Sequence, residues 1–130
     1  MFLVGLTNPK SPYLEDALEP WTPNGAGERL YHMVRMVIEV SKEEYFSRVH
    51  AINVVDAGPR RVFTLVGSTP AVVLGRDAWS VLELPRDSEW HESHFNWHLV
   101  PHPSGRCRLY NDDAVRLKTG RLIARLGGFR

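Results

Sequence analysis

Residues 97–108 read WHLVPHPSGRCR. The apolar run at residues 97–101 predicts a buried strand, and the prolines and glycine that follow turn the chain away from a sheet. His102 and Ser104 lie on this turn. Loops at the ends of strands carry much of the chemistry of α/β proteins. The stretch therefore predicts a strand that ends in a rigid functional loop, and a plain polar turn is the alternative.

Three more apolar runs of strand length precede this one, at residues 2–6, 50–55 and 71–74. Helices are predicted between these runs and after the last one. A glycine-rich start at 25–28 opens the first helix, and a capping box precedes the second at 42–48. Further helices are predicted at 60–66, at 77–84 and after Asp112. Short apolar strands that alternate with helices indicate a parallel sheet covered on both faces. We expect one domain, residues 1–130, that is a three-layer α/β sandwich with a central four-stranded parallel sheet.

The composition excludes several classes of protein. The 130 residues carry a net charge of only +1, although basic residues gather towards the C-terminus. Cys107 is the only cysteine, which excludes an internal disulfide, a cysteine-ligated zinc and an iron–sulfur cluster. The six histidines lack metal-ligand spacing, and neither a membrane span nor a signal peptide is predicted. We expect a cytoplasmic monomer that uses no metal and no cofactor.

The strand ends converge on one group of polar residues. Right-handed crossovers place the C-terminal ends of parallel strands at one edge, which brings together Asn8, Asn53, Gly75 and His102. An asparagine carboxamide matches the edge of a pyrimidine, and a neutral histidine can stabilise the anion of a departing base. Aromatic residues can stack on a base, and glycine or basic residues can contact phosphate; the candidates are Tyr13, Trp21, Gly25, Gly27, Ser104 and Arg106. These residues describe a pocket for an extruded nucleobase.

Simpler interpretations stay open for each of these residues. Asn53 could satisfy buried backbone groups, Trp21 could cover the core, and Tyr13 could anchor its loop. The glycines at 25–27 could form only a tight turn, and the basic last helix could be a solvated face. The sequence has no Gly-x-Ser-x-Gly elbow, Walker loop or dinucleotide fingerprint.

Five segments in order resemble the uracil-DNA glycosylase superfamily, most closely the branch with a Gly-rich first motif. They are VGLTNP at 4–9, NGAGERL at 24–30, INVV at 52–55, VVLG at 72–75 and HPSGR at 102–106. The resemblance covers roughly residues 3–112. It implies that Asn8 positions the attacking water, Asn53 reads the base and His102 faces the base carbonyl. It also implies that the loop after His102 enters the DNA, so we add Gly105 and Arg108 to the DNA-binding residues.

The sequence departs from the superfamily at several positions. Thr7 and Asn8 replace the combinations of the most active branches, and which of the two faces the pocket stays open. Arg106 stands where an apolar wedge is common, and the segment 56–71 is short. We therefore expect a DNA glycosylase for uracil or a modified pyrimidine in single- or double-stranded DNA. The alternatives are a non-catalytic module that binds nucleic acid, a nucleotide or a protein, and a small-molecule enzyme on a generic doubly wound sheet.

Overall fold

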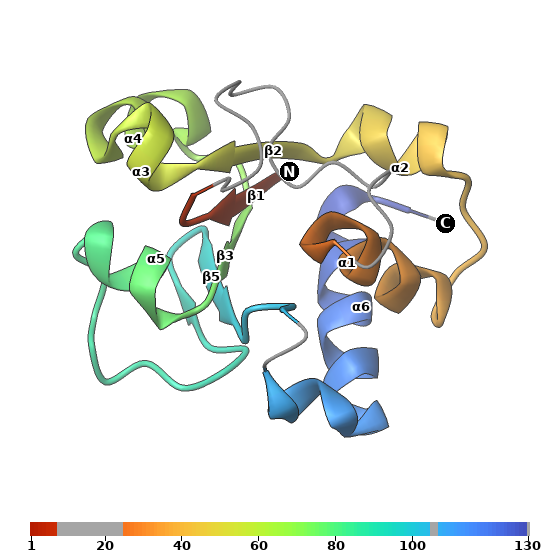
Figure 1. Ribbon diagram of the computed structural model, residues 1–130. Coiled ribbons are helices and arrows are strands. Elements are labelled where there is room, and N and C mark those ends of the chain that lie inside the picture. Colours follow the sequence, from red (N-terminus) through yellow and green to blue (C-terminus); the bar gives the residue numbers. More distant parts are fainter. Residues whose placement is uncertain (8–24, 105–106, 130) are drawn as a thin grey trace.

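A five-stranded, mostly parallel sheet forms the centre of the protein (Figure 1). The computed structural model describes residues 1–7, 25–104 and 107–129. The strand order is β2-β1-β3-β5-β4. The parallel strands are β1 (Phe2–Gly5), β2 (His50–Asn53), β3 (Ala71–Leu74) and β5 (Trp97–Val100). The four predicted parallel strands are therefore present and share their C-terminal edge.

The sheet has one strand more than the four that the sequence predicts. The extra strand, β4 (Ser93–His94), pairs antiparallel with β5 at the edge of the sheet. Phe95 and Asn96 connect the two strands, and Phe95 turns the chain with a φ of 55°. A strand of two residues is too short to show an alternating pattern in the sequence, and a phenylalanine is an uncommon residue at positive φ. This hairpin therefore carried no sequence signal.

The helices cover both faces of the sheet (Figure 1). On one face lie α1 (Ala26–Arg35), α2 (Lys42–Arg48) and α6 (Asp113–Gly127). On the other lie α3 (Val54–Ala57), α4 (Pro59–Val66) and α5 (Arg76–Val81). A 3-10 helix, η2 (Arg108–Asn111), precedes α6. The predicted α/β architecture with helices on both faces is confirmed, except that α3 begins at Val54, inside the predicted second strand.

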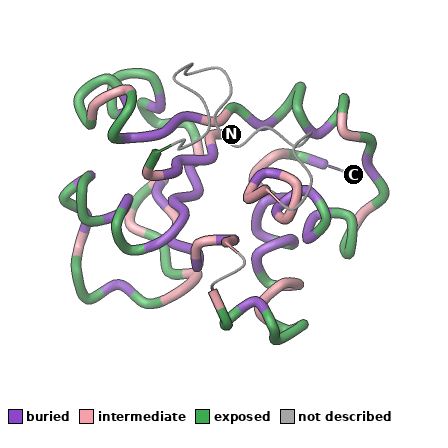
Figure 2. The backbone as a smooth tube through the Cα atoms, viewed as in Figure 1, coloured by how far each residue is buried: buried purple, intermediate pink, exposed green. Residues whose placement is uncertain are grey.

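Alternating side chains of the strands build two separate cores. Leu3 and Val72 pack towards α1, α2 and α6, while Val4 and Val73 pack towards α3, α4 and α5. All four side chains are 0–1% exposed. Figure 2 shows these buried segments running through the middle of the molecule, with exposed residues on the outer sides of the helices. Strands buried on both faces read as continuous apolar runs, which is why the sequence revealed them.

Helices α1 and α6 cross at very close range. A Cβ added to Gly120 of α6 would lie 2.2 Å from the carbonyl oxygen of Met33 in α1. No side chain fits at this position, so the glycine allows the two helix backbones to touch. The same pair of helices forms two walls of the cavity described below.

Candidate functional site

The C-terminal edge of the sheet holds two of the predicted site residues, Asn53 and His102, together with Gly75. β2 ends at Asn53, β3 is followed by Gly75, and β5 leads into His102. Asn53 and His102 belong to strands that are separated by β1 and β3. His102 lies two residues beyond the end of β5, and it packs against Gly75 at the end of β3. The two residues therefore lie at the same C-terminal edge of the sheet.

Asn53 is a nearly buried amide at the junction of β2 and α3. The residue is 3% exposed, and it is the N-cap of α3 without a side-chain capping hydrogen bond. No hydrogen bond joins its carboxamide to another residue in the described part of the chain. Buried amides normally have partners. The alternative in which Asn53 satisfies buried backbone groups is thus not seen among these residues.

The backbone around Asn53 is fixed by contacts between the first two strand ends. The Val55 amide donates to the Leu6 carbonyl oxygen over 2.9 Å. The Thr7 hydroxyl donates to a carboxylate oxygen of Asp56 over 3.1 Å. One of the two candidates for the water-positioning residue is therefore already hydrogen-bonded to helix α3.

His102 is positioned by the glycine that follows β3. A Cβ added to Gly75 would lie 3.1 Å from the His102 Cβ, and Gly75 has a φ of +89°, which disfavours any other residue. Burial lowers the pKa of His102 below its usual value, and the negative charge of Asp77 offsets part of this effect. The imidazole is therefore neutral at neutral pH. A neutral imidazole has one N–H to donate and one nitrogen that accepts.

Five predicted site residues lie outside the described residues: Asn8, Tyr13, Trp21, Gly105 and Arg106. Gly25 is the N-cap of α1, and Gly27 is buried in the first turn of that helix. Arg108 is exposed at the start of η2. The structure therefore brings Asn53, Gly75 and His102 to one edge of the sheet. The other described candidates lie at the start of α1, in the loop after β5 and in η2.

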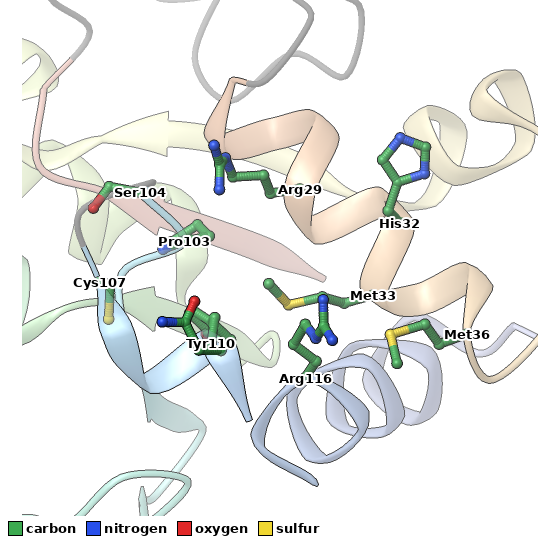
Figure 3. A pocket seen from close by; sticks show the side chains of 10 residues that line it. Arg29, His32, Met33, Met36, Pro103, Ser104, Cys107, Tyr110 and Arg116 are labelled. Carbon is green, nitrogen blue, oxygen red and sulfur yellow. The ribbon is translucent and has the colours of Figure 1, made fainter. Parts of the chain in front are cut away.

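A cavity lies beside the predicted loop (Figure 3), and it is the larger of the two that are described in this section. Its volume is about 390 Å³, within the range of about 300–1,000 Å³ in which small ligands bind. Helix α1, the loop after β5, η2 and α6 line it with Arg29, His32, Met33, Met36, Pro103, Ser104, Cys107, Tyr110, Asn111 and Arg116. Ser104 is the only predicted site residue among them. Neither Asn53 nor His102 lines it, so the predicted residues are not shown to share one hollow.

The charges of this cavity are cationic. Arg29 and Arg116 line it, and the described residues of its lining include no aspartate or glutamate. Arg116 pairs with Asp113 one turn earlier on α6, but its Nε is buried and has no partner in the described structure. His32 lies 3.8 Å from Glu28 on α1, measured from Nε2 to the carboxylate oxygen. A buried N–H without a partner favours an incoming acceptor.

A buried hydrogen-bond chain holds the wall of the cavity. The Tyr110 hydroxyl donates to the Pro101 carbonyl oxygen over 2.6 Å and lies 3.3 Å from the Thr119 hydroxyl. Thr119 in turn lies 2.8 Å from Nε2 of His91. His91 lines the second cavity, of about 250 Å³, which has a mostly apolar lining that includes Trp90 and Lys118. The chain fixes η2 and α6 against the loop that carries His102.

Sequence reasoning missed most of the residues that line the larger cavity. Arg29, His32, Met33 and Met36 are spaced as one helical face, which is a detectable signal. The partner face on α6 comes from the far end of the chain, so no local pattern connects Arg116 to it. The cavity depends on tertiary packing.

In the described residues, no three His, Cys, Asp or Glu side chains come together to hold a metal ion. None of the described helices has the length and apolar character that crossing a membrane requires. A scan against protein-family models gave no match, and searches of curated proteins and of solved structures gave none either.

Proposed function

We propose that this protein is a monofunctional DNA glycosylase that removes uracil or a modified pyrimidine from DNA. The proposal includes the type of fold: a uracil-DNA glycosylase-like domain in which the four parallel strands carry the site. DNA as the partner belongs to the same proposal. The monomeric state and the cytoplasmic location stay predictions from the sequence.

One observation carries the proposal. A nearly buried carboxamide without a described partner, Asn53, and a neutral imidazole, His102, lie at the same edge of a parallel sheet. Ligands of open α/β sheets bind at this edge. An amide can recognise a pyrimidine edge through one donor and one acceptor, and an imidazole N–H can donate to a carbonyl oxygen of the same ring.

The proposed reaction is hydrolysis of the N-glycosidic bond. Water adds to C1′ of the sugar and loses a proton, while the bond to the base nitrogen breaks and its electron pair leaves with the base. The negative charge spreads to the base carbonyl, where the His102 N–H donates a hydrogen bond that strengthens as the charge grows. Asn8 orients the water in this proposal, on the strength of the sequence alone. Loss of the proton to solvent balances the reaction.

The remaining predicted residues have supporting roles in the proposal. Ser104, Gly105, Arg106 and Arg108 contact the DNA backbone, together with Gly25 and Gly27 at the start of α1. Tyr13 and Trp21 stack on the extruded base. Two of these roles have structural support, because Ser104 is half-buried beside a cationic cavity and Arg108 is exposed next to it.

The test is a base-release assay on oligonucleotides that contain uracil, hydroxymethyluracil or a mismatched base, followed by alkaline cleavage of abasic sites. We expect release by the wild-type protein and a loss of about 10²–10³-fold in His102→Ala, the size seen when one stabilising donor is removed. His50→Ala is the matched control, because His50 is exposed and lies at the opposite end of β2. Absence of release from every substrate would refute the proposal.

A second candidate is a binding domain on the same fold that leaves the base intact. It is favoured by the position of the larger cavity, which is lined by Ser104 and two arginines and by neither Asn53 nor His102. DNA binding that persists in His102→Ala, without base release from the wild-type protein, would support this candidate. Base release that His102→Ala abolishes would exclude it.

A further inference from the structure

The cavity between α1 and α6 has the features of a ligand site that is separate from the sheet edge. It combines an apolar floor with cationic groups (Figure 3). Met33, Met36, Tyr110 and Pro103 provide apolar surface. In Figure 3, Arg116 reaches from α6 towards Met33, with Ser104 and Cys107 on the opposite side. Such a mixture suits a molecule with an apolar body and a charged head.

The charge of the site selects an anion. Among the described residues of the lining, the two formally charged ones are both arginines. The guanidinium of Arg116 is oriented by Asp113, which engages Nη2 and leaves the buried Nε without a described partner. The pair lies at the surface, with the Asp113 side chain 72% exposed, so it contributes little stability and can open. A phosphate or carboxylate is the head group whose geometry fits a guanidinium.

The apolar surface of the cavity favours a flat ring as the apolar part of the ligand. Thioethers make favourable contacts with aromatic rings, and Met33 and Met36 line the same side of the cavity. Ser104 and Asn111 provide hydroxyl and amide groups within the same cavity. The volume admits a molecule of one or two rings and is small for a polymer.

We propose that the cavity between α1, η2 and α6 binds a small organic anion that has an aromatic ring and a phosphate or carboxylate head. Arg116 contacts the head group, and the two methionines contact the ring. The site shares Ser104 with the proposed DNA contacts but includes neither Asn53 nor His102, so binding of a small molecule in the absence of DNA holds or fails independently of base release.

Cys107 gives a direct way to observe occupancy. It is the only cysteine of the chain and lines the cavity. Alkylation by iodoacetamide, followed by mass spectrometry, therefore reports on this cavity alone. The probes are phenyl phosphate, benzoate, uridine 5′-monophosphate, phenol and inorganic phosphate, each also titrated by calorimetry against the full chain.

We expect phenyl phosphate or benzoate to bind and to slow alkylation, and we expect phenol and inorganic phosphate to bind at least tenfold more weakly. The comparison of phenyl phosphate with benzoate identifies the head group, and uridine 5′-monophosphate tests whether a nucleotide is accepted. Arg116→Met should weaken binding about tenfold or more, since it removes a charge-assisted hydrogen bond but keeps an apolar chain of similar length. Arg121→Met is the matched control, because Arg121 is exposed on the same helix and does not line the cavity.

Three results would overturn the proposal. One is that no aromatic anion binds at millimolar concentration or protects Cys107. Another is that phenol or inorganic phosphate binds as tightly as phenyl phosphate. The third is that Arg116→Met, folded as judged by circular dichroism, retains the wild-type affinity.

Discussion

Replacing Gly120 by alanine tests the packing on which the cavity depends. The new Cβ would lie 2.2 Å from the Met33 carbonyl oxygen and 2.7 Å from the Met33 carbonyl carbon. Both are backbone atoms of a helix and have no rotamer with which to move away. For the oxygen contact to reach the ordinary range, which begins at 3.4 Å, the helices must separate by about 1.2 Å.

Two effects of opposite sign decide the free energy of unfolding. Alanine is a better helix former than glycine by about 1 kcal/mol, which stabilises α6. Overpacking a close-packed contact costs about 1–3 kcal/mol and occasionally more. Since the contact is between two backbones, we expect the upper end of this range. The net change is a destabilisation of about 2 kcal/mol, or a fall in melting temperature of about 6–10 °C for a chain of this size.

The measurement is urea unfolding followed by tryptophan fluorescence, because Trp79 and Trp97 are buried. Arg121→Ala and Arg121→Gly provide the control, since their difference at an exposed neighbouring position gives the helix-propensity contribution by itself. We also expect Gly120→Ala to change the binding of phenyl phosphate, because Met33 lines the cavity. If Gly120→Ala is as stable as the wild-type protein, or more stable, the close approach of α1 and α6 is refuted.

Two further predictions concern stability. Burial lowers the pKa of three histidines: His91, His98 and His102. Below the usual histidine pKa of about 6.5, the unfolded chain binds more protons than the folded one. The free energy of unfolding should therefore fall as the pH drops below about 6.5, and these groups should not affect it at higher pH. Replacing each histidine by glutamine should flatten this pH dependence, as measured by urea titrations at several pH values. The Tyr45 hydroxyl is buried without a partner in the described chain, whereas the Tyr31 hydroxyl donates to the Val40 carbonyl oxygen over 2.7 Å. Tyr45→Phe should therefore leave stability unchanged or raise it, and Tyr31→Phe should lower it by about 1 kcal/mol; equal losses in the two variants would contradict the assignment.

The sequence predicted β1, β3 and β5 well because these strands are largely buried on both faces. The run at 71–74 has no exposed side chain, and its predicted limits agree with β3. The second strand was predicted too long, since Val54 is as apolar as a strand residue but begins α3. Periodicity cannot separate a buried strand end from a buried helix start when both are apolar.

The strand-end residues were predictable for a topological reason. Parallel strands joined by right-handed crossovers must end at one edge, so the presence of Asn53 and His102 at the same edge follows from the order of elements alone. The neutral state of His102 does not follow in this way. It depends on burial, which lowers the pKa of His102 by more than the negative charge of Asp77 raises it, and only the packed structure supplies this balance.

The cavity shows where local patterns stop being informative. In the sequence, Gly120 reads as a residue that weakens the last helix. In the structure it sets the distance between α6 and α1, and that distance decides whether Arg116 and Met33 can line the same hollow. Glycine in the interior of a helix lowers the helix propensity, so its presence there indicates a packing reason such as a close backbone contact. The side chains one turn away from such a contact are therefore the first candidates for a cavity between two helices.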